Sequence, residues 1–310
     1  MSSKKAVVVT GSLGFIGSQV VRQCLNRGWY VMGVDKHTYA ASKKTLSEFD
    51  NDPNYTHVKE DISKLKHLPD CDYVVNVAAE THVDNSIAAS KVFLDSNITG
   101  VYNLLELIRS KKLNRPVLIH FSTDEVYGDI NEGSHSESDL LKPSNPYSAS
   151  KASADQLVIA WSRTYGINYN IVRPTNNYGP RQYPEKLIPK SIKCLRMGKK
   201  IPLHNGGTPY RMWLHSEDTA RGVMCILESG SLNEIYNISG DIELQNIEVV
   251  NYIINKFGIQ DAIDYSYDRK GQDVRYSVDD SKLRRLGWKP EKNFWKELDK
   301  LIETDEGYIW

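Results

Sequence analysis

Short apolar runs alternate with stretches of helical periodicity along roughly the first 120 residues. The apolar runs are rich in β-branched residues and predict four buried strands, at 6–10, 30–34, 73–78 and 117–121. Between them, apolar residues recur every three or four positions, as in Ile16, Val20 and Cys24, which is typical of an amphipathic helix. This alternation predicts right-handed βαβ crossovers and an α/β fold with a Rossmann-type, doubly wound parallel sheet.

The pattern changes at about residue 176. Two loops, NNYGPRQYPEK at 176–186 and HNGGTPYRMW at 204–213, interrupt the alternation and supply amide, aromatic and basic side chains that suit a ligand site. Helices are predicted at 186–197, 216–228, 246–257 and 279–286, and a short strand at 202–204. We expect a Rossmann domain at 1–175 and a smaller α/β substrate-binding domain at 176–310, some of whose elements return to the first sheet.

Composition and charge narrow the class of protein. The 310 residues are 40% hydrophobic and 25% charged, which argues against collagen-like and disordered chains. Thirty-nine basic residues balance 39 acidic ones, so no overall field favours nucleic acid or an anionic membrane. The four cysteines include no C-x-x-C pair, and we expect no metal site and no disulfide scaffold. The first residues lack a long apolar run, so a cytoplasmic protein is expected.

Three glycines follow the first predicted strand at intervals of three residues. Gly11, Gly14 and Gly17 stand where a tight turn, a close approach of backbone to a pyrophosphate and helix-strand packing each need a residue without a Cβ. Asp35 ends the next strand, 18 residues after Gly17, where a carboxylate binds the adenosine ribose hydroxyls and repels a 2′-phosphate. The segment therefore predicts an NAD site; the alternative is a tight turn and a strand end with no ligand.

Tyr147 and Lys151 lie four residues apart at the start of a predicted helix, so their side chains share one face. A nearby ammonium favours the phenolate, and we expect it to lower the pKa of Tyr147 towards the range of a general base. An exposed helical pair is the alternative, which the glycine motif makes less favourable.

Thr123, Asp124 and Glu125 follow the predicted strand at 117–121, so they lie at the carboxyl edge of the sheet, where open α/β folds bind ligands. A solvated acidic turn capped by the threonine is one interpretation. The other is an acid-base pair, because a buried carboxyl beside a second carboxylate has a raised pKa, leaving one protonated and one ionised group at neutral pH.

The chain resembles the extended short-chain dehydrogenase/reductases in TGSLGFIG, Asp35, VAAETHVD and Tyr147-x-x-x-Lys151. Within them, the segments STDEVYGD, NNYGPRQYPEKLIP, RMWLHSEDTARG and EIYNISG resemble the nucleoside-diphosphate-glucose 4,6-dehydratases, which act on dTDP-glucose or UDP-glucose. The resemblance implies a lyase with tightly bound NAD that is recycled in each turnover. Its product would be a 4-keto-6-deoxy sugar nucleotide, a precursor of deoxysugars such as rhamnose, and a homodimer is expected.

The resemblance also implies roles for particular residues. Tyr147 would be the base at the 4-hydroxyl with Thr123 bonded to the same oxygen, while Glu125 would act at C5 and Asp124 would protonate the leaving 6-hydroxyl. The implied cofactor contacts are Gly11, Gly14, Phe15, Ile16, Gly17, Asp35, Lys36, Thr38, Asp61, Ile62, Val77, Ala78, Ala79, Thr81, Ser96, Tyr147, Lys151 and Asn177. The implied substrate contacts are Thr81, Thr123, Asn176, Lys186, Leu187, Pro202, Leu203, His204, Arg211, Asn246 and Arg269.

Arg211 and Arg269 are expected to clamp the diphosphate, because a guanidinium can hold two oxygens at once; an ordinary surface arginine is the alternative at position 269. The alternative functions are a 4-epimerase or decarboxylase on the same scaffold, an inactive NAD-binding regulator, and an RNA-binding protein. The acidic pair disfavours the first, the full catalytic set the second, and the neutral charge the third. The choice between dTDP and UDP stays open.

Overall fold

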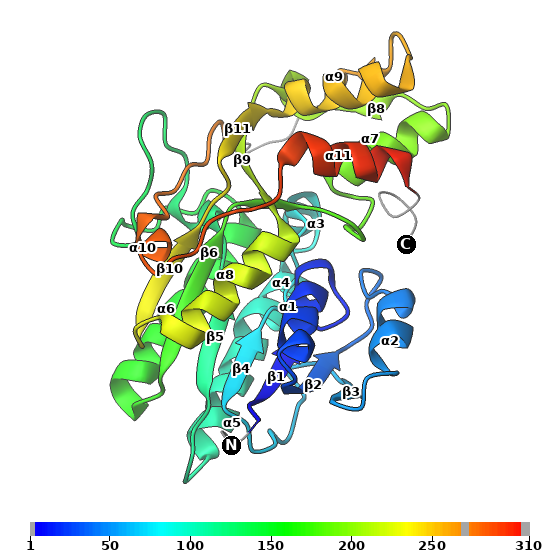
Figure 1. Cartoon of the computed structure of the whole chain (residues 1–310). Helices are drawn as coiled ribbons and strands as arrows, with labels where there is room; N and C mark the ends of the chain where they lie inside the picture. Colours follow the sequence, from blue (N-terminus) through cyan, green and yellow to red (C-terminus); the bar gives the residue numbers. More distant parts are fainter. Residues whose placement is uncertain (1–3, 268–272, 305–310) are drawn as a thin grey trace.

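A parallel sheet forms the centre of the computed structural model, which describes residues 4–267 and 273–304. Within these residues the sheet has seven strands in the order β10-β6-β5-β4-β1-β2-β3, and every neighbouring pair is parallel (Figure 1). The strands are β1 (Ala6–Thr10), β2 (Tyr30–Asp35), β3 (Tyr55–Lys59), β4 (Tyr73–Asn76), β5 (Val117–Phe121), β6 (Tyr169–Pro174) and β10 (Glu234–Ile238). The predicted doubly wound α/β sheet is confirmed, with β1 and β5 at the predicted residues.

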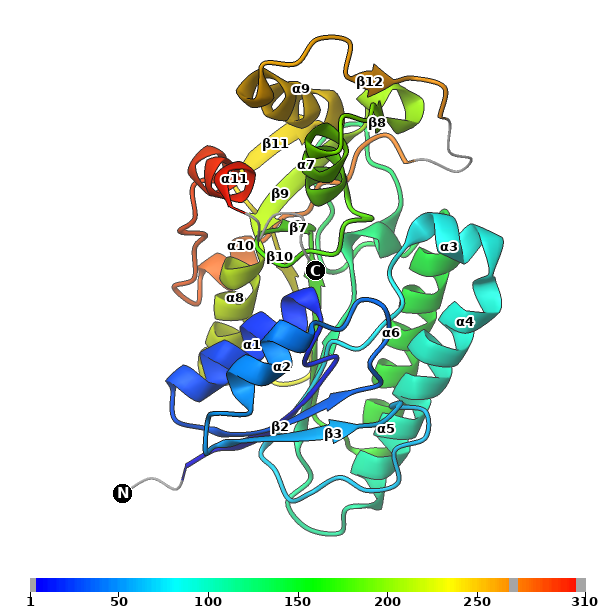
Figure 2. The same ribbon diagram turned by 90° about the vertical axis from the view of Figure 1, so that its right-hand side faces the viewer.

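Helices cover both faces of this sheet (Figure 2). One face carries α1 (Phe15–Asn26), α2 (Lys43–Phe49) and α8 (Ser216–Ser229). The other carries α3 (Val83–Ala88), α4 (Ser90–Leu94), the π-helical turn η1 (Asp95–Thr99), α5 (Gly100–Ser110) and α6 (Pro146–Tyr165). Val7 and Val9 belong to the core under α1, and Val8 to the core under α5. Because successive strand residues face opposite sides, a sheet covered twice needs the continuous apolar runs seen in the sequence.

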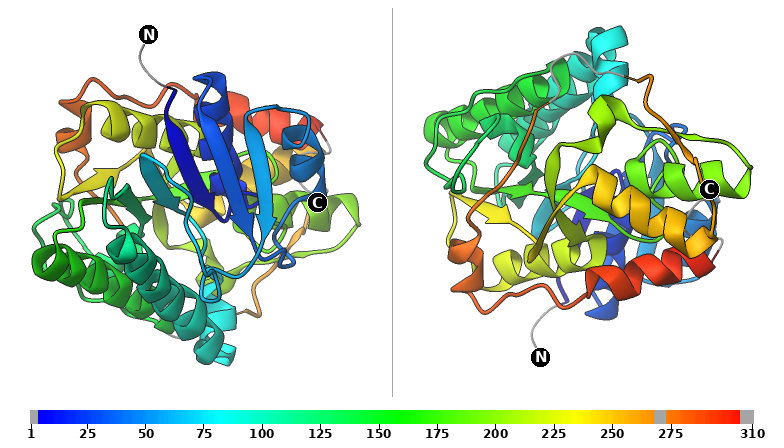
Figure 3. Two further views of the ribbon diagram at one scale, coloured as in Figure 1. Left: turned by 90° about the horizontal axis from the view of Figure 1, so that it is seen from below. Right: turned by 90° about the horizontal axis from the view of Figure 1, so that it is seen from above.

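A smaller unit stands above the carboxyl ends of the parallel strands (Figures 1 and 3). Its strands are β7 (Asn176–Tyr178), β9 (Tyr210–His215) and β11 (Ile242–Gln245) in one sheet, and β8 (Ile201–Pro202) and β12 (Ile263–Asp264) in another. Its helices are α7 (Leu187–Arg196), α9 (Asn246–Phe257) and α11 (Phe294–Glu303). These elements share a third hydrophobic core. The short helix α10 (Ser281–Arg284) lies beside β10, and α8 and β10 belong to the large sheet although they come late in the chain.

The four helices predicted in the second half of the chain agree with the structure to different degrees. That at 246–257 is confirmed, that at 216–228 extends by one residue, and that at 186–197 loses one residue at each end. The prediction at 279–286 is too long, because Asp279 accepts a bond from the Ser281 amide and the helix begins after this turn. The strand at 202–204 is wrong beyond Pro202: left-handed Asn205 turns the chain into η3 (His204–Gly207).

Short connections join the two parts of the molecule. Thr175 alone separates β6 from β7, and its amide donates to the Ile238 carbonyl of β10. Helix α8 starts at the residue after β9 ends, without a linker. In the described residues no helix has both the length and the apolar character needed to cross a membrane.

Candidate active site

Three adjoining cavities lie where the parallel strands end. The first, of about 1010 Å³, lies over the glycine turn and β2, and we refer to it as the cofactor cavity. The second, of about 1110 Å³, reaches into the smaller unit and is called the sugar-nucleotide cavity, after the substrate that the resemblance implies. A middle cavity connects them. Thr81, Gln182 and Lys186 line all three, so the three cavities adjoin one another.

The glycine turn leaves no room for side chains. Gly11 has φ +64°, and a Cβ there would lie 2.8 Å from the Ala78 amide nitrogen. A Cβ on Gly17 would lie 2.0 Å from the Gly11 carbonyl oxygen. Gly14 caps α1 and offers no side chain to the free N–H groups of the first turn, which leaves them for an anion. The turn therefore fits the pyrophosphate of a dinucleotide.

The Asp35 carboxylate lies at the edge of the cofactor cavity and is held by two backbone donors. The Leu13 amide donates to Oδ2 at 3.1 Å and the His37 amide to Oδ1 at 2.8 Å. The charge of neighbouring Lys36 is balanced by Glu80 at 3.2 Å and Asp61 at 3.9 Å. With its ammonium facing carboxylates, Lys36 does not offset the repulsion that Asp35 exerts on a 2′-phosphate, and the residues fit NAD better than NADP.

The structure brings the predicted cofactor residues together. Those that line the cofactor cavity are Gly11, Gly14, Phe15, Ile16, Gly17, Asp35, Lys36, Thr38, Asp61, Ile62, Val77, Ala78, Ala79, Thr81 and Ser96. Ser96 belongs to the π-helical turn η1, which places it in the wall of this cavity. The other three, Tyr147, Lys151 and Asn177, line the middle cavity.

Tyr147 and Lys151 face the middle cavity from the first two turns of α6, which begins with an Asn145 cap and Pro146. The Lys151 ammonium donates to the Phe121 carbonyl oxygen at 2.5 Å. Burial raises the pKa of Tyr147, and the charge of Glu125 adds to this shift. The expectation that the ammonium lowers this pKa is therefore wrong for this structure, because burial dominates. Burial lowers the pKa of Lys151 to about 8, against the opposing charge of Asp155.

Thr123, Asp124 and Glu125 lie at the start of the 3₁₀ turn η2 (Asp124–Tyr127), directly after β5, and all three line the middle cavity. Thr123 Oγ1 donates to Asp124 Oδ1 at 3.1 Å, while Asp124 Oδ2 is buried without a hydrogen-bond partner in the described structure. Burial, and then the charge of Glu125, raises the pKa of Asp124 to about 7. Burial also raises the pKa of Glu125, against the nearby charge of Arg211. One carboxyl can therefore hold a proton at neutral pH.

A buried ion pair beneath these residues was missed in the sequence. Asp155 Oδ2 accepts from Arg173 at 2.9 and 3.1 Å and from Ser122 Oγ at 3.0 Å. Lys151 and Asp155, one turn apart on α6, thus bind the successive residues Phe121 and Ser122. These bonds fix α6 against the end of β5 that carries the acidic pair. The spacing of Lys151 and Asp155 is visible in the sequence, but their partners on β5 and β6 are not.

The sugar-nucleotide cavity collects most of the predicted substrate residues. They are Thr81, Asn176, Lys186, Leu187, Pro202, Leu203, His204, Arg211 and Asn246, whereas Thr123 lines the middle cavity and Arg269 lies outside the described residues. Arg211 donates to the carbonyls of Tyr210 and Asp273 and stacks on the Tyr276 ring, so its guanidinium is held in place. Gln182 was missed, although it lies in a loop with ligand-type side chains.

The sequence also has close relatives among known proteins. The chain belongs to the family described as GDP-mannose 4,6 dehydratase, which matches residues 8–301. It is 40% identical over 303 residues to the low-salt glycan biosynthesis protein Agl12 of Haloferax volcanii, covering 96% of this chain and 97% of the relative. It is 39% identical to dTDP-glucose 4,6-dehydratase 1 of Escherichia coli K12, covering 96% and 91%.

Solved structures place the fold in the same group. A dTDP-glucose 4,6-dehydratase of Streptomyces venezuelae with NAD bound superposes with a TM-score of 0.92 at 40% identity, covering 96% of each chain. A UDP-glucuronic acid 4-epimerase of Bacillus cereus, also with NAD, has a TM-score of 0.89 but 26% identity, covering 95% of this chain and 96% of that one. The chain is thus more similar in sequence to the dehydratase than to the epimerase.

Proposed function

We propose that this protein is an NAD-dependent lyase that removes water from a nucleoside-diphosphate-glucose, either dTDP-glucose or UDP-glucose, to give the 4-keto-6-deoxy sugar nucleotide. One observation carries the proposal. Asp124 is buried and Glu125 half-buried in the cavity that also holds Tyr147 and Lys151, and the raised pKa of Asp124 lets it keep a proton near neutral pH. An epimerase or a plain oxidase of this fold has no use for an added acid-base pair.

The residues divide the chemistry between them. Because burial favours its neutral form, Tyr147 must first lose its own proton; as the phenolate it then takes the proton of the 4-hydroxyl, and Thr123 bonds the same oxygen. The 4-ketone then acidifies the C5 proton, which Glu125 removes while Asp124 donates a proton to the departing 6-hydroxyl, so that water leaves across C5 and C6. Glu125 afterwards returns a proton to C5. Bound NAD supplies the hydride chemistry, accepting hydride from C4 and returning it at C6, so the reaction has no net oxidation.

The binding assignments follow the cavities. We assign the lining of the cofactor cavity to NAD, with Asn177 near the nicotinamide, and the lining of the sugar-nucleotide cavity to the sugar, diphosphate and nucleoside. Arg211 is poised for the diphosphate because its guanidinium is already held on the Tyr276 ring and by backbone carbonyls. Residues 1–175 would serve mainly the cofactor and residues 176–310 mainly the substrate.

A homodimer formed through α5 and α6 is also proposed, on the resemblance and on apolar side chains left exposed on that side of the molecule. Val92, Tyr102 and Tyr165 are all more than one third exposed there. Sedimentation of the native protein and of Tyr102→Lys tests this, since a dimer at α5 should weaken in the variant. A cytoplasmic location and a product used for deoxysugars such as rhamnose stay predictions from the resemblance.

The function is tested with the purified protein and either sugar nucleotide. We expect a 4-keto-6-deoxy product, detected by its alkali-induced absorbance and by mass, with no net formation of NADH. Asp139→Asn, a change at an exposed carboxylate that lines none of the three cavities, should behave as the parent. A 4-epimerised product, or no turnover at all, would refute the proposal.

A further inference from the structure

The cofactor cavity lies between two segments that are distant in the sequence. On one side, Lys36, Thr38, Ala40 and Ala41 follow β2 and lead into α2. On the other, the loop 179–186 between β7 and α7 contributes Gln182, Tyr183, Glu185 and Lys186. Contacts between these two segments therefore join two walls of the cavity.

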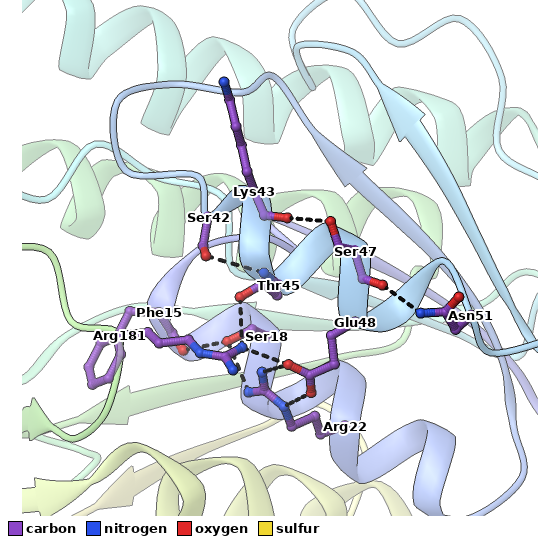
Figure 4. A network of polar contacts seen from close by, with 10 residues as sticks. All are labelled: Phe15, Ser18, Arg22, Ser42, Lys43, Thr45, Ser47, Glu48, Asn51 and Arg181. Carbon is purple, nitrogen blue, oxygen red and sulfur yellow. Dashed lines mark hydrogen bonds and ion pairs between the residues drawn. The ribbon is translucent and has the colours of Figure 1, made fainter. Parts of the chain in front are cut away.

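Arg181 makes the first contact. Its Nη1 donates to Glu48 Oε2 at 2.7 Å and to Thr45 Oγ1 at 3.2 Å, both on α2 (Figure 4). Glu48 also accepts two bonds from Arg22 of α1, at 2.7 and 2.9 Å. These guanidinium groups lower the pKa of Glu48 to about 2, the Arg22 bond being the larger cause, so the carboxylate is ionised at any working pH.

The backbone at Arg181 has an uncommon conformation. Its φ is +62°, in the left-handed region that costs a residue with a Cβ some free energy. A neighbouring proline and a glycine in the extended positive-φ region precede it. The loop thus holds a residue in a costly backbone conformation, and the side chain of that residue reaches across to α2.

Two tyrosines make the second contact. The rings of Tyr39 and Tyr183 meet edge to face, with centroids 4.9 Å apart. The Tyr39 hydroxyl also donates to Glu185 Oε2 at 3.3 Å. The loop 179–186 is therefore joined to the first half of the chain at two points, and Gln182 lies between them in the wall of the cavity.

The proposed reaction requires the cofactor to stay bound throughout a turnover, and the inference about these two contacts rests on that proposed function. Hydride taken from C4 must be kept until it is returned to C6; a reduced cofactor that escaped in between would leave the sugar oxidised and the enzyme without its hydride. We propose that Tyr39, Glu48, Arg181 and Tyr183 form a clasp that slows dissociation of the dinucleotide during turnover. The clasp residues position the cofactor cavity's wall and take no part in proton transfer.

Dissociation of the cofactor tests the clasp directly. The protein is loaded with NADH, mixed with excess NAD, and the loss of fluorescence of the bound NADH is followed. We expect Arg181→Gln and Glu48→Gln each to speed release about two- to fivefold, the upper part of the range for a partly exposed ion pair. The double variant should release no faster than the more affected single one, because both changes break the same bond.

Control variants test whether the loss of any similar ion pair would also speed release of the dinucleotide. Arg27, the residue after α1, and Glu228 of α8 form a similar pair at 2.7 Å, and neither residue lines the cofactor cavity. Glu228→Gln should leave the release rate unchanged. Arg22→Gln weakens the attachment of α2 to α1 but keeps the bond between Arg181 and Glu48, so it should have less effect than Arg181→Gln.

Two results would overturn the clasp: release at the parent rate in both Arg181→Gln and Glu48→Gln, or an equal acceleration in Glu228→Gln. A second measurement links the clasp to turnover. With sugar nucleotide present, the clasp variants should release free NADH and a 4-keto, 6-hydroxy sugar in a larger fraction of cycles than the parent. If no dehydration occurs at all, the proposed function fails, whereas the release rates still decide the clasp.

Discussion

Replacing Asp124 with Asn should separate the two halves of the reaction. Asn can accept the Thr123 Oγ1 bond that Asp124 Oδ1 accepts at 3.1 Å, but it cannot donate a proton to a leaving hydroxyl. Oxidation at C4 should proceed, and loss of water should slow by about 10²- to 10⁴-fold, the usual contribution of a general acid. This corresponds to roughly 3–5 kcal/mol of activation free energy. In a single turnover, absorbance of bound NADH should rise and persist.

The same change should alter how stability depends on pH. The pKa of Asp124 is about 7 in the folded protein, above its ordinary value of 3.8, so the folded state holds this proton more tightly than the unfolded chain does. The stability from this group is complete below the unfolded pKa and is lost as the pH rises from about 4 through about 7. The loss amounts to roughly 4 kcal/mol. Asn carries no such charge. As the pH rises, the unfolding free energy of Asp124→Asn should therefore increase relative to that of the parent, by up to about 4 kcal/mol.

The assay combines both measurements on one pair of variants. Urea unfolding is followed at acid, neutral and mildly alkaline pH, and water loss is followed by rapid mixing at neutral pH. Asp139→Asn is the control, because hydrogen bonds from Ser136 and His135 lower the pKa of that exposed carboxyl. It should leave water loss unchanged and show no gain in stability as the pH rises. Dehydration by Asp124→Asn at the parent rate would end the assignment of Asp124 as the acid, and parallel pH curves would contradict its buried titration.

Three further changes test other parts of the site. Tyr147→Phe should abolish the first hydride transfer, so no bound NADH appears in rapid mixing; detectable reduction of NAD would mean that another base acts at C4. Gly17→Ala should weaken NAD binding at least tenfold in calorimetry, because the new Cβ would lie 2.0 Å from the Gly11 carbonyl oxygen; unchanged affinity would contradict the packing of the turn. Asp155→Asn should cost about 3–5 kcal/mol of unfolding free energy by leaving the buried Arg173 charge without its partner, and a loss below about 1 kcal/mol would show that the pair is dispensable.

Local signals made much of the fold predictable from the sequence. The strands at 6–10 and 117–121 were predicted to the residue because both faces of a parallel sheet are covered, which requires unbroken apolar runs. The glycine turn and Asp35 were predictable because their spacing is set by contacts within one βαβ unit. The placement of Thr123 to Glu125 followed from one fact, that β5 ends just before them.

Features that depend on tertiary contacts were not predictable in this way. The spacing of Tyr147 and Lys151 placed both side chains in one cavity, but it could not show that burial raises the pKa of the phenol or that the ammonium bonds Phe121. The partners of Arg181 and Asp155 come from segments 133 and 18 residues away along the chain. No periodicity within one element encodes such pairs, since they arise only when separate elements pack together.

The way the chain passes between the two sheets limits how the molecule can open. With one residue between β6 and β7, and with α8 continuing directly from β9, neither crossing offers a flexible hinge. Rigid-body rotation of the upper part about these crossings would therefore have to distort β6, β7, β9 or α8 themselves. Admission of a sugar nucleotide must instead depend on small movements of loops at the rim, which predicts a site whose shape is largely set before substrate arrives.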